Sequence, residues 1–296
     1  MEREIGIDLS SPGVDQEVFT GLESTIDNFK QVGFDYVEIA VHSVDGIMNG
    51  RLNNENALRM RQILEYHGLK ATVHAPDLLN LREERNSDLQ KQVFMASIDF
   101  ARIINANILV YHVGAAKPDS LEKWKTETLC RKEIEALKSL CDYAFTREVQ
   151  ICLENLEMTS AQELVDIITQ VQKENIGICY DFGHAYLFYN HFYEEGKEKF
   201  LESVQTILPY LKHIHIHDNF GRVSAGPGEK PYIERLPFGE DDLHMPIGMG
   251  GIPYKKVFQL IRGYKGIFLM EIKARYERFY KDALETLKSL LKNEES

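Results

Sequence analysis

The sequence predicts a closed (β/α)8 barrel, formed by a single domain over residues 1–296. Two observations support this fold. Short apolar strand segments alternate with helical segments eight times, with no break in composition between the two halves of the chain. Most strand segments also end in a histidine, aspartate or glutamate, and a barrel gathers functional residues at the carboxyl ends of many strands. An open doubly wound sheet would need a glycine-rich phosphate turn after an early strand, and Gly6 and Gly13 do not form one.

Each predicted unit joins a strand to the helix that follows it. The predicted strands cover residues 4–10, 36–42, 70–76, 107–114, 149–155, 176–184, 211–219 and 266–273. The predicted helices cover residues 22–32, 53–67, 88–105, 129–147, 161–173, 194–208, 254–264 and 276–292. The one long connection, residues 220–252, is rich in glycine and proline, so we expect it to cover an active site rather than to separate domains.

Charge and composition exclude several classes of partner. The formal net charge of −12 argues against a nucleic-acid or anionic-membrane partner, because a phosphate polymer would be repelled. No apolar run approaches the ~18 residues of a membrane span, and residues 1–4 have no signal-peptide character. The four cysteines show no C-x-x-C spacing, so we expect reduced, mostly buried thiols in a cytoplasmic protein.

The segment 211–219 contains three histidines that alternate with two isoleucines. In an extended strand this period of two places His213, His215 and His217 on one face. A partly exposed edge strand would explain an isolated pair of such histidines. Here other strand segments also end in acidic or imidazole side chains, which favours a shared ligand site.

The candidate ligands lie at strand ends all along the chain. Alternate strand residues share a face, so Cys152 and Glu154 point the same way, as do Glu271 and Lys273. The strand-end set is Glu38, His42, His74, His112, Glu154, Asp181, His184, His215, His217 and Glu271, and the long connection adds Asp242 and His244. Mixed carboxylate and imidazole ligands suit Zn²⁺, Mn²⁺ or Co²⁺, whereas Mg²⁺ and Ca²⁺ favour oxygen alone.

Each candidate also has an ordinary structural explanation. A single histidine at a strand end is more often a capping or hydrogen-bonded residue than a metal ligand. Glu154 and Glu271 are harder to explain in this way, because a carboxylate that ends an apolar inward-facing run is costly unless it meets a cation or a donor. We expect His67 and His191, in helical segments, to be surface residues, and the aromatic cluster 186–193 to pack or to line a pocket.

The motifs, taken in order, resemble one known group of barrels. They read His74-Ala-Pro, His112-Val-Gly, Leu153-Glu154-Asn155, Asp181-Phe-Gly-His184, His215-Ile-His217-Asp218-Asn219, Asp242-Leu-His244 and Met270-Glu271. This set is similar to the xylose-isomerase-like TIM barrel superfamily, which holds sugar and sugar-phosphate isomerases and epimerases together with abasic-site nucleases of the endonuclease IV type. The resemblance covers nearly the whole chain.

The resemblance implies a metal site at the carboxyl face of the barrel. In the sugar epimerases the ion is held by matches to Glu154, Asp181, His215 and Glu271. In the nuclease branch a three-metal cluster uses these four together with matches to His74, His112, His184, Asp242 and His244. All nine positions carry the matching residues here. One to three ions of Zn, Mn or Co are therefore implied, and the ligand count does not separate the two branches.

Other features favour the sugar branch. The nuclease branch usually has Asp-Thr-Cys-His where residues 181–184 read Asp-Phe-Gly-His, and the sugar branch commonly has the His-Asp-Asn found at 217–219. The nuclease branch also carries basic loops that grasp DNA, whereas the loops at 77–80, 115–119 and 238–242 are neutral to acidic. We therefore expect a metal-dependent sugar or sugar-phosphate isomerase or epimerase without a nucleic-acid or membrane partner. The alternative is an endonuclease IV-like phosphodiesterase acting on abasic DNA.

The expected reaction removes a proton next to a carbonyl and passes through an enediolate. Glu154 and Glu271 end the fifth and eighth strands, so they approach a substrate from nearly opposite sides, and one can remove a proton that the other returns. We expect Glu38, His217 and Lys273 to contact the substrate, although Lys273 could instead form a salt bridge to a neighbouring carboxylate. Three other functions stay open: a metal-binding protein without catalysis, a dehydratase, and a hydrolase that uses the same ion. Assembly into a homo-oligomer also stays open.

The long connection supplies Asp242 and His244, which could reach one ion on the same side if that stretch is extended. Its many glycines lose much backbone entropy when they are fixed. We therefore expect metal occupancy and the order of this connection to be coupled. The alternative is that Asp242 and His244 form hydrogen bonds across the connection, which would keep it ordered with or without metal.

Overall fold

The structure is a computed structural model that describes residues 3–9, 19, 21–114, 123–224 and 231–292. Several positions used in the sequence analysis lie outside the described residues: Ser10 at the end of the first predicted strand, Gly13, the loop 115–119 and residues 225–230 of the long connection.

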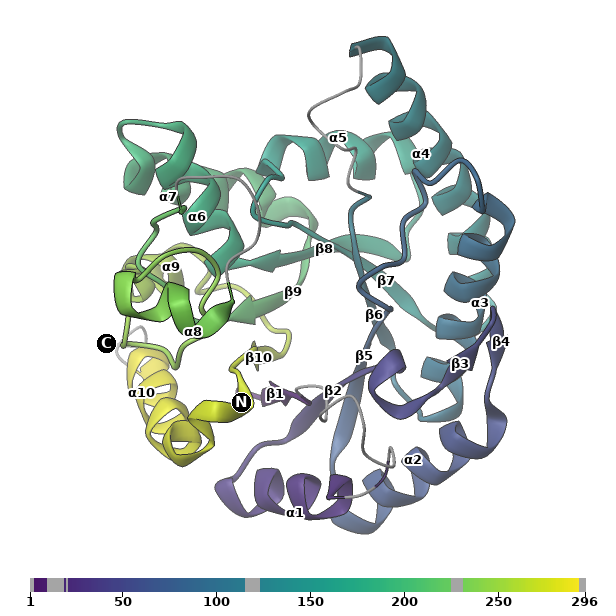
Figure 1. Cartoon of the computed structure of the whole chain (residues 1–296), viewed down its shortest axis with the longest axis horizontal. Coiled ribbons are helices and arrows are strands. Elements are labelled where there is room, and N and C mark those ends of the chain that lie inside the picture. The colour runs from purple at the N-terminus through teal and green to yellow at the C-terminus, as the bar shows by residue number, and fades with distance from the viewer. Residues whose placement is uncertain (1–2, 10–18, 20, 115–122, 225–230, 293–296) are drawn as a thin grey trace.

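Eight parallel strands close into a barrel in the order β1-β10-β9-β8-β7-β6-β5-β2, with helices around it (Figure 1). This closed order confirms the predicted barrel and excludes the open sheet. The barrel strands are β1 Ile5–Asp8, β2 Tyr36–Ala40, β5 Lys70–His74, β6 Ile108–His112, β7 Gln150–Glu154, β8 Ile176–Asp181, β9 Leu211–Ile216 and β10 Phe268–Met270. A short hairpin that was not predicted, β3 Ile47–Met48 with β4 Arg51–Leu52, forms a separate antiparallel sheet.

Some helices begin at a capping side chain or end at a glycine. The Ser160 hydroxyl accepts a hydrogen bond from Glu163 N at 3.2 Å at the start of α5, and Gly33 ends α1 at φ 106°. The helices are α1 Leu22–Val32, α2 Asn54–His67, α3 Ser87–Ile103, α4 Lys123–Phe145, α5 Ala161–Val171, α6 Phe182–Phe192, α7 Gly196–Ile207, α8 Tyr232–Arg235, α9 Tyr254–Leu260 and α10 Tyr280–Lys292.

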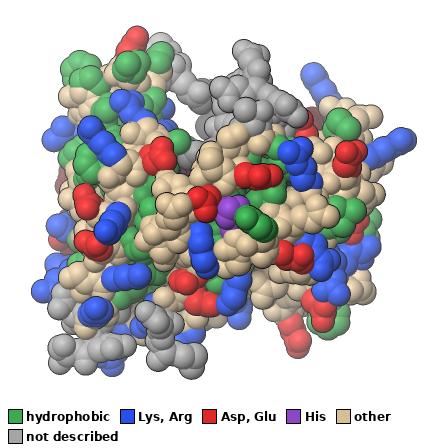
Figure 2. Space-filling model, turned by 90° about the horizontal axis from the view of Figure 1, so that it is seen from below, with side chains coloured by type: hydrophobic (Ala, Val, Ile, Leu, Met, Phe, Trp, Pro, Cys, Tyr) green, Lys and Arg blue, Asp and Glu red, His purple; other side chains and the backbone are tan. Residues whose placement is uncertain are grey.

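Among the described helices, none is long and apolar enough to cross a lipid bilayer. On the face shown in Figure 2, acidic and basic side chains are interspersed.

Strand β9 has the two faces that its period of two predicts. Ile214 and Ile216 pack in the main hydrophobic core. His213 Nε2 and His215 Nε2 lie 3.3 and 3.0 Å from the carboxylate of Glu38 on β2. Because β2 and β9 are not neighbours in the barrel, these side chains meet through its interior.

A small apolar cluster of Val110, Cys152 and Cys179, separate from the main core, lies beneath the polar side chains. Val110 is paired in register with Cys152, and two residues further along the same strands His112 is paired with Glu154. The polar residues therefore stand directly above this cluster. All four cysteines are free thiols, three of them buried, as the sequence analysis expected.

Some predicted boundaries are wrong. The strand predicted at 176–184 ends at Asp181, because this side chain caps α6 by accepting a hydrogen bond from His184 N at 2.7 Å. His184 therefore lies in the first turn of α6, a helix that is not among the eight predicted ranges although His191 within it was expected in a helical segment. The strand predicted at 36–42 ends at Ala40 before a 3₁₀ turn, and β10 ends at Met270, so Glu271 directly follows its strand.

Candidate metal centre

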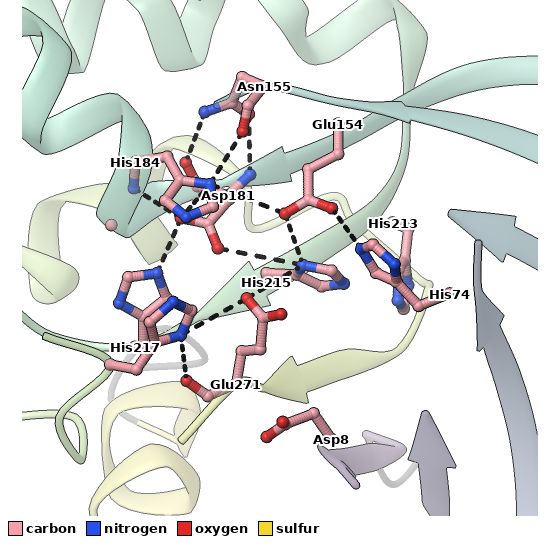
Figure 3. Close-up of polar contacts among 12 residues, drawn as sticks. Asp8, His74, Glu154, Asn155, Asp181, His184, His213, His215, His217 and Glu271 are labelled. Carbon is pink, nitrogen blue, oxygen red and sulfur yellow. Dashed lines mark hydrogen bonds and ion pairs between the residues drawn. The ribbon is translucent and has the colours of Figure 1, made fainter. Parts of the chain in front are cut away.

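Imidazole and carboxylate side chains converge at the carboxyl ends of the barrel strands (Figure 3). Among the described residues, three adjoining groups there have ligand atoms within 4.8 Å of one another: a central group of Glu154, Asp181, His215 and Glu271, a second group of His74, His112 and Glu154, and a third group of His184, His217, Asp242 and His244. The nine residues that the resemblance implied as ligands all fall in these groups. A further group, Cys179, His213 and His215, lies one step deeper in the barrel.

In the central group three carboxylates face one imidazole nitrogen. His215 Nδ1 lies 3.0 Å from Glu154 Oε1, 3.5 Å from Glu271 Oε2 and 3.9 Å from Asp181 Oδ2. Asp181 Oδ2 and Glu271 Oε2 are buried atoms without a hydrogen-bond partner. Carboxylates buried so close together repel one another unless a cation lies among them. The donor set therefore fits a divalent ion that accepts oxygen and nitrogen ligands.

Both glutamates of the central group favour their ionised form. Burial by itself raises the pKa of Glu154, but the charges of His215 and His112 outweigh burial and hold the pKa well below its usual range. Burial likewise raises the pKa of Glu271, and the charge of the nearby His215 reverses that effect and holds it well below the usual range. Both side chains are therefore carboxylates near neutral pH.

The second group shares Glu154 with the central group. His74 Nε2 lies 3.0 Å and His112 Nε2 lies 3.3 Å from Glu154 Oε2, while the other carboxylate oxygen faces His215. Burial lowers the pKa of His74, but the hydrogen bond and charge of Glu154 outweigh burial and raise it to about 10. Glu154 thus has the arrangement of a carboxylate that could bridge two ions.

In the third group, three imidazoles surround one carboxylate. His184 Nε2 lies 3.4 Å from Asp242 Oδ2, and His217 Nδ1 lies 3.6 Å from Asp242 Oδ1. His244 Nε2 also contacts Asp242 Oδ2. His217, expected from the sequence to contact substrate, lies together with these candidate ligands in the structure.

A cavity of about 110 Å³ opens beside the central group, and its polar lining consists of Asp8, Glu38, His42, His74, Asp77 and Glu271. Glu38 lines this cavity as expected, but its carboxylate also accepts a hydrogen bond from Thr72 Oγ1 at 2.8 Å and lies 3.0 Å from His215 Nε2. Lys273 Nζ lies 5.3 Å from the centre of the Tyr232 ring and forms no ion pair within the described ranges.

Three residues that support the site were not among the predicted site residues. Asn155 exchanges two side-chain hydrogen bonds with the backbone of Asp181, both at 3.0 Å. The Asp218 carboxylate accepts hydrogen bonds from the backbone N–H groups of residues 248 and 252 at 2.9 and 3.2 Å, and so ties the far end of the long connection to β9. Asp8 accepts from the backbone N–H of residue 272 at 2.9 Å, beside Glu271. Asp8, Asn155 and Asp218 each end or follow a barrel strand, and this position is the sequence signal that could have identified them.

A family model described as a xylose isomerase-like TIM barrel matches residues 26–290. An uncharacterised protein of Methanocaldococcus jannaschii is 25% identical over 274 residues, which cover 88% of this chain and 83% of that protein. An inosose dehydratase of Yersinia enterocolitica is 28% identical over 49% of this chain and 48% of its own length. A probable endonuclease 4 of Mesomycoplasma hyopneumoniae is 24% identical over 64% of this chain and 63% of its own length.

Solved structures share the fold over the whole length of the chain. A D-tagatose 3-epimerase-like protein superposes with a TM-score of 0.73 at 21% identity, covering 99% of this chain and 100% of that chain. The D-psicose 3-epimerase of Clostridium cellulolyticum H10 superposes with a TM-score of 0.71 at 17% identity, covering 97% of this chain and 99% of its own. With a family model that spans most of the sequence and a barrel closed in the predicted order, the chain belongs to the xylose isomerase-like TIM barrel family.

Proposed function

We propose that the protein is a divalent-metal-dependent isomerase or epimerase of a sugar or sugar phosphate, which removes a proton from a carbon next to a carbonyl. The observation that carries this proposal is the pair Glu154 and Glu271. They come from β7 and from the end of β10, which β8 and β9 separate in the barrel, and they flank His215 Nδ1 at 3.0 and 3.5 Å. Two carboxylates on different sides of one centre suit removal of a proton from one face of a carbon and its return to the other.

Glu154, Asp181, His215 and Glu271 would hold the ion, and the buried oxygens without partners support this assignment. Zinc, manganese or cobalt suits their mixed oxygen and nitrogen donors, and the second and third groups leave room for up to three ions. A divalent ion in such a site polarises a carbonyl group and stabilises the negative charge that develops as a proton leaves.

The surroundings of Glu271 and Glu154 support different catalytic roles. Glu271 lines the cavity, and its Oε2 has no hydrogen-bond partner, so it is free to take a proton. Glu154 is fully buried, with His215 at one oxygen and with His74 and His112 at the other. We assign proton removal to Glu271 and proton return to Glu154, whose neighbouring imidazoles can carry the proton.

The cavity supports a small substrate rich in hydroxyl groups. Its lining of carboxylates and imidazoles offers many hydrogen-bond acceptors within about 110 Å³. The same carboxylates would repel a phosphate group, so a phosphorylated substrate would have to extend its phosphate away from them. Lys273, two residues after Glu271, is the cation that we assign to this role.

The test is exchange of carbon-bound hydrogen for solvent deuterium, followed by NMR over a panel of ketoses and aldoses. Metal-loaded protein should exchange the hydrogen next to the carbonyl in at least one of these sugars. Glu271→Gln should slow the exchange by about 100-fold or more, since a positioned base contributes roughly 10²–10⁴-fold. His191→Asn, which alters an exposed histidine on α6, is the matched control. Equal exchange by wild type and Glu271→Gln would contradict the proposal.

A second candidate, a metal-dependent phosphodiesterase acting on abasic DNA, is favoured by the nine candidate ligands in three adjoining groups. The net charge of −12 and the interspersed charges on the face in Figure 2 argue against it, because duplex binding needs a surface that follows the phosphates. We expect metal-loaded protein to leave a duplex with one abasic site uncut. Metal-dependent nicking that Glu271→Gln abolishes would favour the second candidate.

A further inference from the structure

Three positively charged side chains gather around one tyrosine ring on α8. Arg275 Cζ lies 4.9 Å and Lys273 Nζ lies 5.3 Å from the centre of the Tyr232 ring. Arg235 Cζ lies 5.9 Å from the same point. We propose that Lys273, Arg275 and Arg235 bind the phosphate group of a phosphorylated sugar. This inference rests on the proposed function and narrows its substrate to the phosphorylated class.

The three positive charges are not balanced by carboxylates. Across the part of the chain that the structure describes, no ion pair joins Lys273, Arg275 or Arg235 to an acidic side chain. Arg235 Nε is also buried without a hydrogen-bond partner among these residues. Like charges that lie close together repel one another unless an anion lies among them. In a chain with a net charge of −12, this group is a local concentration of positive charge that suits an anion.

The Tyr232 ring contacts the three cations but does not neutralise them. An aromatic face attracts a cation through its quadrupole and carries no net charge. Burial and the hydrogen bond with Tyr276 raise the pKa of Tyr232, so its hydroxyl stays protonated near neutral pH. The group therefore keeps its full positive charge.

The acidic side chains nearest in sequence do not supply the missing charge. Glu277 Oε1 accepts a hydrogen bond from Asn28 Nδ2 at 2.7 Å, and Glu271 Oε2 lies 3.5 Å from His215 Nδ1. Glu234 is exposed on α8 and forms no ion pair with the group. The charge is thus left for a ligand.

Hydrogen bonds hold this group beside the candidate metal centre. Tyr232 Oη donates to Leu243 O at 2.9 Å, between the two candidate ligands of the long connection, and accepts from Tyr276 Oη at 2.7 Å. Lys273 N donates to His244 O at 3.2 Å. The cations therefore have a fixed place relative to the segment that carries Asp242 and His244.

The group also lies within reach of a sugar bound beside Glu271. Ile272 packs in the main hydrophobic core, so the side chains of Glu271 and Lys273 on either side of it point away from that core. Two residues of extended chain span roughly 6.6 Å, which is comparable to the length of a sugar. A sugar with its carbonyl group beside Glu271 would place a phosphate at its far end among the cations.

A phosphate monoester suits this group better than a sugar acid or a nucleic acid does. It carries nearly two negative charges near neutral pH and three acceptor oxygens, which match two guanidinium forks and one ammonium group. A carboxylate offers one charge and two oxygens. A DNA duplex presents a row of phosphates and needs a basic surface that follows them, whereas Lys273, Arg275 and Arg235 form a single patch around one ring.

The experiment is calorimetric titration of metal-loaded, full-length protein with D-fructose 6-phosphate and D-ribulose 5-phosphate, each compared with its unphosphorylated sugar and with D-glucuronate. At least one phosphorylated sugar should bind about 100-fold more tightly than its free form. Lys273→Gln, Arg275→Gln and Arg235→Gln should each weaken this binding by about 10-fold, because a hydrogen bond to a charged group contributes about that factor or more. Arg275→Lys, which keeps the charge, should lose less than Arg275→Gln.

Arg278→Gln is the matched control, since Arg278 is an exposed arginine whose Cζ lies 4.6 Å from the centre of the Phe279 ring. It should keep the affinity of wild type, and circular dichroism should show that every variant is folded.

Four results would overturn the proposal. The first is that no phosphorylated sugar binds more tightly than its free form. The second is an affinity that the three glutamine variants leave unchanged, which would place the phosphate on the metal ions. The third is tighter binding of D-glucuronate, and the fourth is binding of an abasic duplex that these variants abolish.

The titration reports binding and not turnover, so it separates this inference from the proposed function. If phosphate binding depends on the three cations but no sugar exchanges its hydrogen for deuterium, only the proposed proton transfer is contradicted.

Discussion

Two buried polar clusters lie at the carboxyl end of the barrel, and they differ in whether the protein alone satisfies them. The first joins Arg82 to Glu133 and Glu163. Glu133 is fully buried, yet its Oε2 accepts from Arg82 Nε at 2.7 Å, and its Oε1 accepts from Tyr111 Oη at 2.9 Å and from Gly114 N at 2.8 Å. Arg82 also donates to Glu163 at 2.9 Å. Each charge in this cluster therefore has a partner of opposite sign.

The candidate metal centre differs, because several of its buried polar atoms have no hydrogen-bond partner within the described residues. Asp181 Oδ2, Glu271 Oε2, Asp242 Oδ1 and His217 Nδ1 are buried without a hydrogen-bond partner. The comparison teaches that burial of charged groups does not by itself mark a binding site. A missing donor or cation does, since buried polar groups in a purely structural cluster are satisfied within the protein.

The largest expected effect concerns the satisfied cluster. Glu133→Ala leaves Arg82 with only Glu163, whose side chain is 37% exposed, and removes the acceptor of Tyr111 and Gly114. Loss of one partner of a buried ion pair costs roughly 3–5 kcal/mol, so the free energy of unfolding in urea should fall by about that amount. Glu163→Ala, the partly exposed partner, should cost about 1 kcal/mol or less. The losses should be equal with and without chelator, and a metal-dependent loss would mean that the two clusters are not independent.

Asp181→Asn should affect stability only when metal is present. The amide oxygen can still cap α6, and the substitution removes one of three carboxylates that repel one another, so metal-free protein should be about as stable as wild type. An ion at 100 times its dissociation constant stabilises the folded state by about 2.7 kcal/mol. Added Zn²⁺ should therefore raise the free energy of unfolding of the variant by about 2.7 kcal/mol less than it raises that of wild type. A zinc-induced increment equal to that of wild type, measured by urea denaturation, would remove the central group from the metal centre.

The sequence was enough to predict the closed barrel and the convergence of nine side chains, because both follow from strand alternation and from which residue ends each strand. It was not enough for His184, because Asp181 both ends β8 and caps α6, and the apolar pattern of 176–184 does not show that a helix begins directly after it. The place of His217 in the third group depends on where the long connection brings Asp242 and His244, which strand alternation does not specify. The pairing of Arg82 with Glu133 spans 51 residues, and no local pattern reveals it.

The smallest expected effect lies at Glu38, which the protein satisfies only in part. Its Oε2 accepts from Thr72 Oγ1 at 2.8 Å, while its Oε1 lies 3.0 Å from His215 Nε2 without the alignment of a hydrogen bond. A carboxylate behind a metal-binding imidazole orients the ring and raises its basicity. Glu38 therefore belongs partly to each kind of cluster.

Thr72→Val tests this intermediate position, because it keeps the side-chain volume and removes the hydroxyl that holds Glu38. Loss of one buried hydrogen bond should lower the free energy of unfolding by about 1 kcal/mol with or without metal. The freed carboxylate should also orient His215 less well, so zinc affinity at the central group should fall by about 10-fold.

Ser97→Ala is the matched control, since it removes a buried hydroxyl that donates to Val93 O at 2.9 Å within α3. It should cost similar stability and leave zinc affinity unchanged. Equal zinc affinity in Thr72→Val and Ser97→Ala would mean that Glu38 has only a structural role. Its carboxylate would then be satisfied inside the barrel and would not influence the ion.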